Sequence, residues 1–516
     1  MDYKVDLIRN EGFAWHKRSG INIKGYFYLN GCFTETDGVI SFLEGFQNKQ
    51  QFIEKVLQLN GCFSIVAKVE NGIIAVSDTT RSFPLFYTLK SNVMRISDDS
   101  ETLVAATGFK KFNEKGVIDY LHSGCVFHNE TLIESVLQVS AMSYMFFNTN
   151  SGETEYTKYK TIYTSDYEIK TEDSMIGLLD ELFKNAAKKL VDSLKGKTAV
   201  VALSGGVDSR ACLMMLKMMD YKKVICFTYG WRGCGEESTA KKVAENLGYN
   251  YLFIPHKSKE WRKTYKDSES LRYIRYSGNL NAISHMESHY AVRHLLENNL
   301  IPKGSVMITG HIGLVAGSKF NLEEFYTKDE IMKMFWEYWM KLYSYKGKRK
   351  DFYNERFAPY FPQIGPYKCH ETEIIYENAA FDTVRSKHII NFHRVFEFYN
   401  MEWRMPLMDY EVMAGFEKIF PGVREKTKKV FTRYVLEHTG KDIPPAEAGM
   451  SYFSKAYRNL RNPVYSIITP ARFLFSGRKN SLLPPFPVRQ YRFLRRFYSY
   501  CALSEIKLIE KWLKNL

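Results

Sequence analysis

The sequence is 516 residues long and carries 72 Lys and Arg against 57 Asp and Glu, a formal net charge of +15. A chain of this length exceeds what one hydrophobic core usually organises, so two or three domains are expected. Apolar residues make up 45% and aromatic residues 15%, which excludes a mainly disordered chain. No apolar run approaches the ~20 residues of a membrane-spanning helix, which excludes an integral helical membrane protein.

Eight cysteines are scattered along the chain without any Cys-x-x-Cys pair. Residues 1–20 lack the pattern of a signal peptide. Reduced thiols in a cytoplasmic protein are the simplest interpretation. We therefore expect a cytoplasmic protein that is soluble, or at most attached to a membrane surface.

The first 165 residues are typical of a β-rich domain. Apolar or alternating segments predict five short strands, at 21–29, 61–69, 73–77, 85–89 and 93–97. The pairs Asn71-Gly72 and Ser91-Asn92 stand between consecutive segments, where β-hairpins place their turns. Residues 1–165 are predicted to form one domain.

From about residue 170 strands and helices alternate. Apolar residues recur at helical spacing over 178–194. The segments that follow predict strand, helix, strand, helix and strand, at 199–203, 210–219, 224–229, 236–247 and 251–254. This order indicates a parallel sheet covered by helices, completed by a mainly helical region over 328–438. A second, α/β domain is predicted over 170–450.

A basic and aromatic extension is predicted over 451–516. Between Ser451 and Tyr500 the sequence has ten Lys or Arg, no Asp or Glu, and many interleaved aromatic residues. Such a segment can contact an anionic membrane, a phosphorylated substrate or nucleic acid. It can equally form a basic surface folded back onto the protein.

The strongest local motif is Ser-Gly-Gly-Val-Asp-Ser at residues 204–209, here called the phosphate loop. It follows a predicted strand and precedes a predicted helix, a junction whose backbone N–H groups and helix dipole bind anions. Gly205 and Gly206 permit the turn and leave room for a phosphate, and Ser204 and Ser209 add hydroxyl donors. Asp208 would repel phosphate, so we predict that it binds Mg²⁺.

The loop lacks the lysine of the GxxxxGK[ST] motif. A loop without that lysine suits pyrophosphate, the leaving group when ATP forms a nucleotidyl intermediate. An ordinary tight turn rich in small residues is the alternative. The complete hexapeptide at a strand–helix junction favours the nucleotide site.

The phosphate loop resembles the signature of the ATP-pyrophosphatase superfamily, which includes asparagine, GMP and NAD synthetases, β-lactam synthetase and lasso-peptide cyclases. Three further segments narrow the resemblance to asparagine synthetases. Residues 78–87 resemble the late part of their N-terminal glutaminase domain, 402–409 their ExRxPFLD segment, and 429–433 their KxxLR helix. The order and spacing of all four motifs fit over residues 20–440.

The resemblance implies an Ntn-hydrolase-like α+β sandwich followed by a parallel α/β domain of the adenine nucleotide α-hydrolase type with helical completion. It also implies ATP and Mg²⁺ as cofactors and carboxylate adenylation followed by amine attack, which gives an amide, AMP and pyrophosphate. The residues implied to line the adenine and ribose pocket are Leu203, Tyr229, Thr309 and Gly310. Those implied to hold the pyrophosphate portion are Ser204, Gly205, Gly206, Val207, Asp208 and Ser209.

Lys429 is the implied catalytic lysine, which would stabilise negative charge as a carboxylate attacks the α-phosphate. A solvated helix lysine beside Lys426 and Lys428 is the alternative. We interpret Arg404 and Asp409, both in the 402–409 segment, as a structural ion pair.

One departure from the family concerns its glutaminase nucleophile, a cysteine directly after the initiator methionine. Here the second residue is Asp2, and Cys32 is the nearest cysteine. Cys32 cannot offer a free α-amine, so we interpret it as a buried apolar residue. Glutamine hydrolysis is expected to be lost, which leaves the first domain as a degenerate scaffold.

A second departure lies in residues 308–318, where the family places acidic residues that meet Mg²⁺. The corresponding positions are His311 and Leu314. A histidine donates a hydrogen bond or acts as a base near neutral pH, so His311 is a candidate catalytic residue. A leucine cannot hold a metal ion. Either the metal rests on Asp208 and ATP oxygens alone, or adenylation is impaired.

Two functions of different classes remain. The first is an amide ligase that uses ammonia or an amine of the substrate itself. Its carboxylate would belong to a small molecule, a peptide or an acidic sugar of a surface polysaccharide, the last slightly favoured by the basic segment 451–500. The second is a pseudo-enzyme that binds ATP as a scaffold. A nucleic-acid modifier is less favoured, because the tRNA-thiolating members of the superfamily need paired cysteines. The sequence carries no signal of the oligomeric state.

Overall fold

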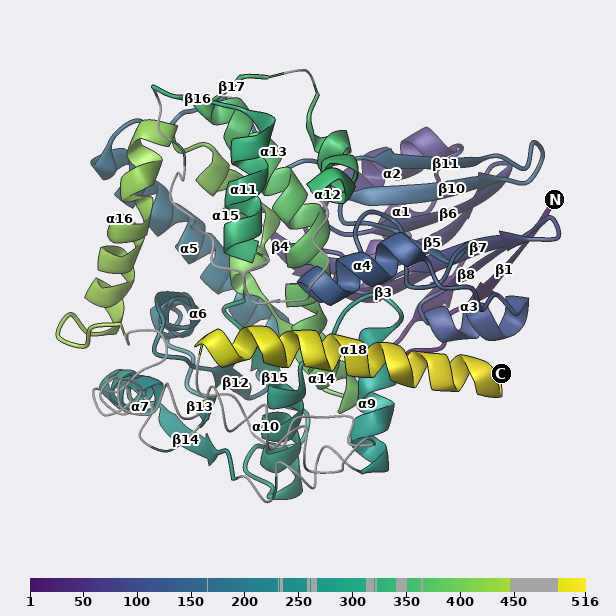
Figure 1. Cartoon of the computed structure of the whole chain (residues 1–516). Helices are drawn as coiled ribbons and strands as arrows, with labels where there is room; N and C mark the ends of the chain where they lie inside the picture. Colours follow the sequence, from purple (N-terminus) through teal and green to yellow (C-terminus); the bar gives the residue numbers. More distant parts are fainter. Residues whose placement is uncertain are drawn as a thin grey trace.

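The computed structural model shows a β-rich domain joined to an α/β domain (Figure 1). The residues it describes are 1–164, 166–230, 232, 235–257, 260, 267–311, 320, 323–339, 350–362, 365–445 and 491–516. Leu314 and residues 451–490, on which two of the sequence interpretations rest, lie outside these ranges.

The first domain contains two stacked β-sheets. The smaller has the order β1-β8-β7-β9, formed by β1 (Asp2–Asp6), β8 (Val93–Ser97), β7 (Phe86–Lys90) and β9 (Leu137–Gln138). The larger has the order β11-β10-β6-β5-β3-β2, with β4 paired to β3. Its strands are β11 (Thr154–Lys158), β10 (Ser143–Asn148), β6 (Gly72–Ser77), β5 (Leu59–Val69), β3 (Ile21–Leu29), β2 (His16–Arg18) and β4 (Cys32–Thr34).

Helices cover the outer faces of both sheets. Alternation along the strands sends Val66, Tyr87 and Met145 between the sheets, and Ile65 toward the helices. The helices are α1 (Thr36–Leu43) and α2 (Lys49–Leu57) on the larger sheet, α3 (Ser100–Thr107) on the smaller, and α4 (Glu114–Ser123) facing the second domain. The resulting helix–sheet–sheet–helix order is the α+β sandwich predicted above.

The second domain is built on a five-stranded parallel sheet of order β14-β13-β12-β15-β18. Its strands are β12 (Ala199–Ala202), β13 (Val224–Gly230), β14 (Asn250–Pro255), β15 (Val306–Ile308) and β18 (Glu402–Arg404). One face packs on α5 (Glu172–Leu194), α6 (Val207–Met218), α7 (Gly235–Leu247) and α16 (Pro421–Thr439). The other packs on α10 (Met286–Glu297), α14 (Arg394–Phe398) and, further out, α9 (Ser268–Gly278). The predicted fold class is confirmed.

The helical completion includes a two-stranded antiparallel sheet. Its elements are β16 (Phe325–Tyr326), α11 (Lys328–Trp339), α12 (Lys350–Phe357), η1 (Ala358–Tyr360), β17 (Tyr367–Lys368), α13 (Cys369–Ala380), the π-helix η2 (Phe381–Ile389), η3 (Ile390–His393), η4 (Pro406–Met408) and α15 (Tyr410–Glu417). Together they cover the top of the α/β domain in Figure 1.

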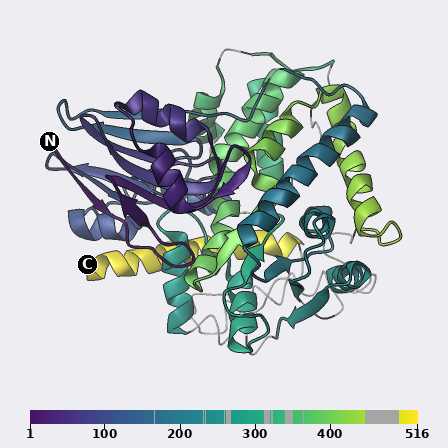
Figure 2. The same ribbon diagram turned by 180° about the vertical axis from the view of Figure 1, so that it is seen from behind.

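The last helix, α18 (Tyr491–Asn515), crosses both domains, as the opposite views in Figures 1 and 2 show. Its Glu505 carboxylate is buried. It accepts hydrogen bonds from the Tyr120 hydroxyl of α4 at 2.5 Å and from the Ser284 backbone N–H at 3.1 Å. Helix α18 therefore ties the two domains together instead of standing apart from them.

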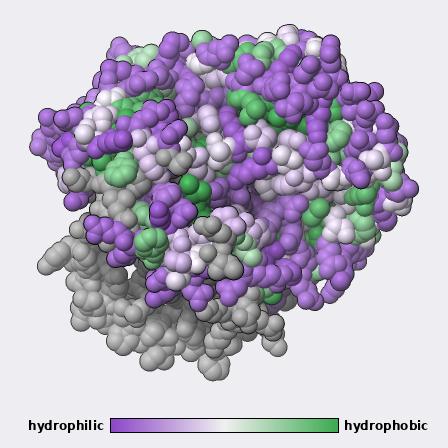
Figure 3. Space-filling model, turned by 90° about the horizontal axis from the view of Figure 1, so that it is seen from above, coloured by the Kyte–Doolittle hydropathy of each residue, from purple (hydrophilic) through white to green (hydrophobic). Residues whose placement is uncertain are grey.

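The face of the molecule in Figure 3 is mainly hydrophilic where it is coloured. On the face in Figure 3, hydrophobic residues form small separate groups. No helix within the described ranges has both the length and the apolar composition needed to cross a membrane.

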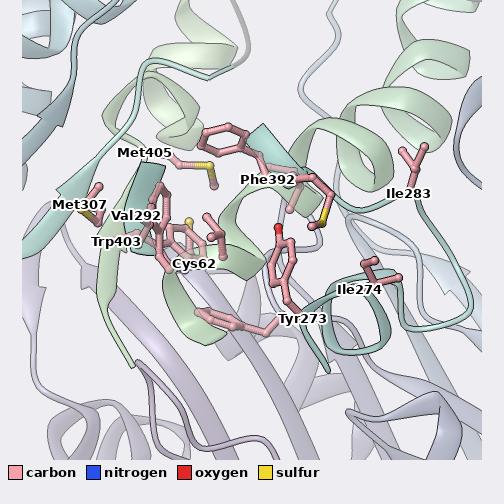
Figure 4. Packing of buried hydrophobic residues seen from close by; sticks show 14 of the residues in the cluster. Cys62, Tyr273, Ile274, Ile283, Val292, Met307, Phe392, Trp403 and Met405 are labelled. Carbon is pink, nitrogen blue, oxygen red and sulfur yellow. The ribbon is translucent and has the colours of Figure 1, made fainter. Parts of the chain in front are cut away.

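Trp403 is the centre of the joint between the domains. Its buried ring lies 5.6, 6.1 and 5.4 Å from those of Phe13, Tyr26 and Phe83 in the first domain. His393 of the second domain packs on it at 4.6 Å. Figure 4 shows Trp403 among further buried side chains, including those of Met307, Met405 and Cys62. The two domains thus share one continuous hydrophobic core.

The predicted ion pair between Arg404 and Asp409 is wrong. Arg404, at the end of β18, pairs with Glu402 at 2.9 Å. Asp409 lies beyond the turn η4, where it pairs with Lys189 at 3.2 Å and accepts the Asn60 amide N–H at 2.9 Å. Because the turn η4 separates them, the two side chains point toward different neighbours, and Asp409 faces the first domain.

The interpretation of Cys32 as buried is also wrong, because its side chain is exposed. Cys32 begins the short strand β4, which pairs with the end of β3 at the margin of the sheet.

Replacing Trp403 with alanine is expected to lower the free energy of unfolding by about 3–5 kcal/mol, because it leaves a cavity in the shared core. Urea unfolding followed by circular dichroism measures the change. Phe325→Ala, at a side chain 60% exposed, is the control and should change stability by less than about 0.5 kcal/mol. Equal stability of the Trp403→Ala and parent proteins would contradict a shared core.

Candidate nucleotide site

The phosphate loop joins the central strand β12 to α6, at the carboxyl end of the parallel sheet. Ligands of open α/β sheets bind at this edge. Leu203 is buried and donates its backbone N–H to the Phe227 carbonyl of β13 at 2.9 Å. The start of the loop is therefore held by the sheet.

The two serines brace the loop. The Ser209 hydroxyl accepts the Ser204 backbone N–H at 3.0 Å and lies 3.0 Å from the Ser204 hydroxyl oxygen. The Ser204 hydroxyl also accepts the Gly206 N–H at 3.2 Å. No side chain caps the amino end of α6, whose first turn begins at Val207. The first-turn N–H groups are thus available to an anion.

Gly310 is in direct contact with the same turn. A Cβ atom at Gly310 would lie 2.7 Å from the Asp208 carbonyl carbon and 2.7 Å from the Ser209 nitrogen. Gly206, by contrast, has an ordinary φ of −81°, and its Cβ would approach only the Ser204 hydroxyl, at 3.3 Å. The close packing of β15 against α6 therefore requires a glycine at 310. This places Gly310 behind the phosphate loop.

Asp208 lies in the first turn of α6, and burial raises the pKa of its carboxyl group to about 6, an effect that the Lys428 charge opposes. Mg²⁺ in nucleotide sites is commonly held by one or two carboxylates together with phosphate oxygens and water. No group of three or more His, Cys, Asp or Glu within the described ranges could hold a metal by itself. Asp208 therefore fits a metal shared with ATP phosphates.

Lys428 and Lys429 are both exposed on α16, which packs against α6. The charge that acts on Asp208 is that of Lys428, a residue that the sequence interpretation gave only as a neighbour of Lys429. In the sequence, the run of basic residues before Val430 was the signal that could have pointed to Lys428. The rotation of helix α16 about its own axis, relative to α6, decides which of the two lysines faces the phosphate loop.

Tyr229 lies at the end of β13, beside the phosphate loop in the sheet order. Its ring stacks on Phe227 at 6.3 Å and lies 5.7 Å from the ring of His256. This half-buried ring lies at the same sheet edge as the phosphate loop, and its part in an adenine pocket stays a prediction.

Thr309 and His393 form a buried hydrogen bond that the sequence did not reveal. The Thr309 hydroxyl lies 2.7 Å from His393 Nε2, and His393 Nδ1 lies 3.1 Å from the Ile390 carbonyl oxygen. A carbonyl can only accept, so His393 carries its proton on Nδ1 and Thr309 donates to Nε2. The threonine next to Gly310 is thereby fixed in orientation.

His311 lies on the same side of β15. Its ring is 3.9 Å from that of Phe392 and 5.5 Å from that of His393. Burial, together with the nearby His285, lowers the pKa of His311 to about 3. Its buried Nδ1 has no hydrogen-bond partner within the described part of the chain. His311 is neutral at pH 7, which favours hydrogen bonding over proton transfer.

Residues 198–271 match the family model of the queuosine biosynthesis protein QueC, a family of PP-loop ATP pyrophosphatases. The matched segment contains the phosphate loop and Tyr229. It ends before Thr309, Gly310, His311 and Lys429. The similarity to PP-loop ATP pyrophosphatases is confined to this segment, and the narrower resemblance to asparagine synthetases stays a prediction.

Two solved structures are similar to this chain. They are the glutamine phosphoribosylpyrophosphate amidotransferase from B. subtilis complexed with ADP and GMP, and a protein described as the allosteric regulatory enzyme of purine biosynthesis. Each is 12% identical to the chain and matches 59% of it, with TM-scores of 0.20 and 0.19. The matches cover 64% and 57% of those proteins, less than two thirds of either.

Gly310→Ala is expected to weaken ATP binding at least tenfold, because the new methyl group displaces the first turn of α6. Isothermal titration calorimetry measures the affinity. Gly177→Ala in α5, where a Cβ would meet nothing within 4 Å, is the matched control and should bind ATP as the parent does. Parent-like affinity in Gly310→Ala would show that the loop tolerates this displacement.

Asp208 predicts a pH dependence of stability in the metal-free protein. Its folded-state pKa of about 6 lies above the ordinary value of 3.8, so the folded protein holds this proton more tightly than the unfolded chain. The associated stability is complete below pH 4 and is lost as the pH rises through 6, a loss of about 3 kcal/mol.

The measurement is urea unfolding in EDTA at pH 4.5 and 7.0, for the parent and Asp208→Asn. The difference in stability between the two proteins should shift in favour of Asp208→Asn at the higher pH. A constant difference across this range would contradict a raised pKa at Asp208.

Proposed function

We propose that this protein binds ATP at the phosphate loop and adenylates a carboxylate, which an amine then attacks to give an amide. The loop at the strand–helix junction, with Asp208 in its first turn and the lysine-bearing helix α16 packed beside it, carries the proposal. The similarity of residues 198–271 to PP-loop ATP pyrophosphatases supports the use of ATP.

In the first step a carboxylate oxygen attacks the α-phosphate of ATP and pyrophosphate leaves. The N–H groups at the start of α6 bind the departing pyrophosphate, and the α16 lysines stabilise the negative charge that develops. Bound Mg²⁺, held by Asp208, would neutralise phosphate charge. Neutral His311 would donate or accept a hydrogen bond to the acceptor.

In the second step an amine attacks the acyl carbon of the mixed anhydride and AMP leaves. Ammonia or an amine of the substrate itself is the proposed nucleophile. Burial raises the pKa of Cys62 to about 12 and that of Cys125 to about 11, so neither of these two buried thiols is activated for glutamine cleavage. The acceptor is proposed to be a small-molecule, peptide or acidic-sugar carboxylate.

ATP–pyrophosphate exchange over a panel of aspartate, acidic sugars and acidic peptides tests the first step. Asp208→Ala and Lys429→Ala should each lower exchange by about 10²–10³-fold, the usual loss when a group that stabilises transition-state charge is removed. Lys428→Ala determines which α16 lysine acts. Lys184→Ala on the exposed side of α5 is the control and should keep full exchange.

Exchange that survives both Asp208→Ala and Lys429→Ala would overturn the proposed site. ATP binding without exchange for any carboxylate would instead identify a nucleotide-binding scaffold. For the second step, ammonium should support amide formation and glutamine should not. Turnover with glutamine alone would disprove the proposed nitrogen source.

A further inference from the structure

A rigid turn of the first domain faces the second domain at residues 78–82. The buried Asp78 carboxylate accepts backbone N–H groups of Phe63 at 2.7 Å and of Thr80 and Ser82, both at 2.9 Å. Arg394 of α14 donates to the Ser82 carbonyl from across the seam. The turn is therefore fixed from both domains.

Arg81 occupies this turn under unusual constraints. Its φ of +58° lies in the left-handed region, which is unfavourable for a residue with a side chain. The residue is only 2% exposed, and its guanidinium carbon lies 5.7 Å from the centre of the Phe86 ring. Its Nε and Nη2 atoms are buried and have no hydrogen-bond partner among the residues that the structure describes. The fold thus holds a strained backbone that presents a buried, unpaired cation.

The charges around Arg81 do not neutralise it. Burial first, and then the charge of Arg394, lowers the pKa of Arg81 to about 9. Burial and the charge of Arg81 likewise lower the pKa of Lys387, in the π-helix η2, to about 7. Lys387 donates to the Val126 carbonyl at 2.8 Å. Three cationic side chains from both domains therefore converge on one buried region.

The carboxylates near this region have other partners. Asp78 binds the N–H groups of its own turn, and Asp382, whose charge acts on Lys387, lies 3.4 Å from Lys158 Nζ. Glu397 pairs with Arg394 at 2.6 Å and accepts the Trp403 indole N–H at 3.0 Å. Among the residues that the structure describes, the Arg81 Nε and Nη2 atoms bond to none of these carboxylates; only the Arg81 backbone N–H bonds to the Asp78 carbonyl, at 3.5 Å.

Other buried arginines of this seam are paired. Arg356, with a side chain 4% exposed, contacts Asp119 and lies 2.7 Å from Glu130 across the seam. Burial of a charge is costly unless the charge is paired, and the fold meets that requirement for Arg356. Arg81 therefore differs from its neighbour in lacking an anion.

We propose that Arg81 binds a small oxyanion, a carboxylate or inorganic phosphate, at the seam between the two domains. A guanidinium group is suited to either, because its N–H donors match two oxygens of one ligand. Lys387 and Arg394 add positive potential from the second domain. The anion would bridge the two domains, and the function of the phosphate loop does not enter this inference.

Thermal unfolding of the full chain in sodium acetate, sodium phosphate and sodium chloride at one ionic strength tests the site. The parent protein should melt a few degrees higher in acetate or phosphate than in chloride, because a ligand that binds only the folded state stabilises it. Acetate alone would identify a carboxylate site, and phosphate alone a phosphate site.

Arg81→Met should reduce the stabilisation by acetate or phosphate below that of the parent, leaving only what anion binding at the phosphate loop contributes, and Arg81→Lys should retain more of it. Arg18→Met, at a side chain 40% exposed and paired with Glu44, is the control and should respond as the parent does. An equal response of the parent to all three salts would overturn the site, whether or not the variants fold. So would an Arg81→Met protein that keeps the parent's preference for acetate or phosphate.

Discussion

The burial of Trp403 is the contact on which the arrangement of this protein depends. Trp403 lies in β18, a strand of the parallel sheet of the second domain, yet three aromatic side chains of the first domain surround its ring. Exposing these aromatic side chains to water would cost more free energy than most single contacts contribute. The α/β sheet therefore cannot complete its core without the sandwich domain.

The same contact extends toward the nucleotide site. His393 packs on Trp403 and fixes Thr309, and the next residue, Gly310, lies against the first turn of α6. Each link is a packed or hydrogen-bonded contact between buried groups, which have little room to adjust. The position of the first domain and the geometry of the phosphate loop are thus set by one continuous set of contacts.

Polar contacts across the seam give the joint its specificity. Asp409 accepts a hydrogen bond from Asn60, Arg356 pairs with Asp119, and Glu505 of α18 accepts a hydrogen bond from Tyr120. Buried ion pairs add little net stability, but a displaced domain would break these hydrogen bonds and leave the buried charges of Arg356 and Asp119 unpaired. The unpaired Arg81 stands out against this pattern.

The sequence by itself determined the elements whose signals are local. The predicted strands 21–29 and 93–97 match β3 and β8 to the residue, and Ser91 and Asn92 adopt the positive φ angles of a hairpin turn. The phosphate loop was recognised because its glycines, serines and aspartate are adjacent in the chain. Periodicity and turn chemistry act over a few residues, so they are visible without a structure.

Only the tertiary structure decided which distant groups meet. Arg404 and Asp409 are five positions apart but have different partners, because the turn η4 separates their directions. The charge of Lys428 opposes the raised pKa of Asp208, an interaction that depends on the packing of α16 against α6. His393 reaches Thr309 across 84 positions of sequence. Such contacts depend on how whole elements pack, and no local pattern records that packing.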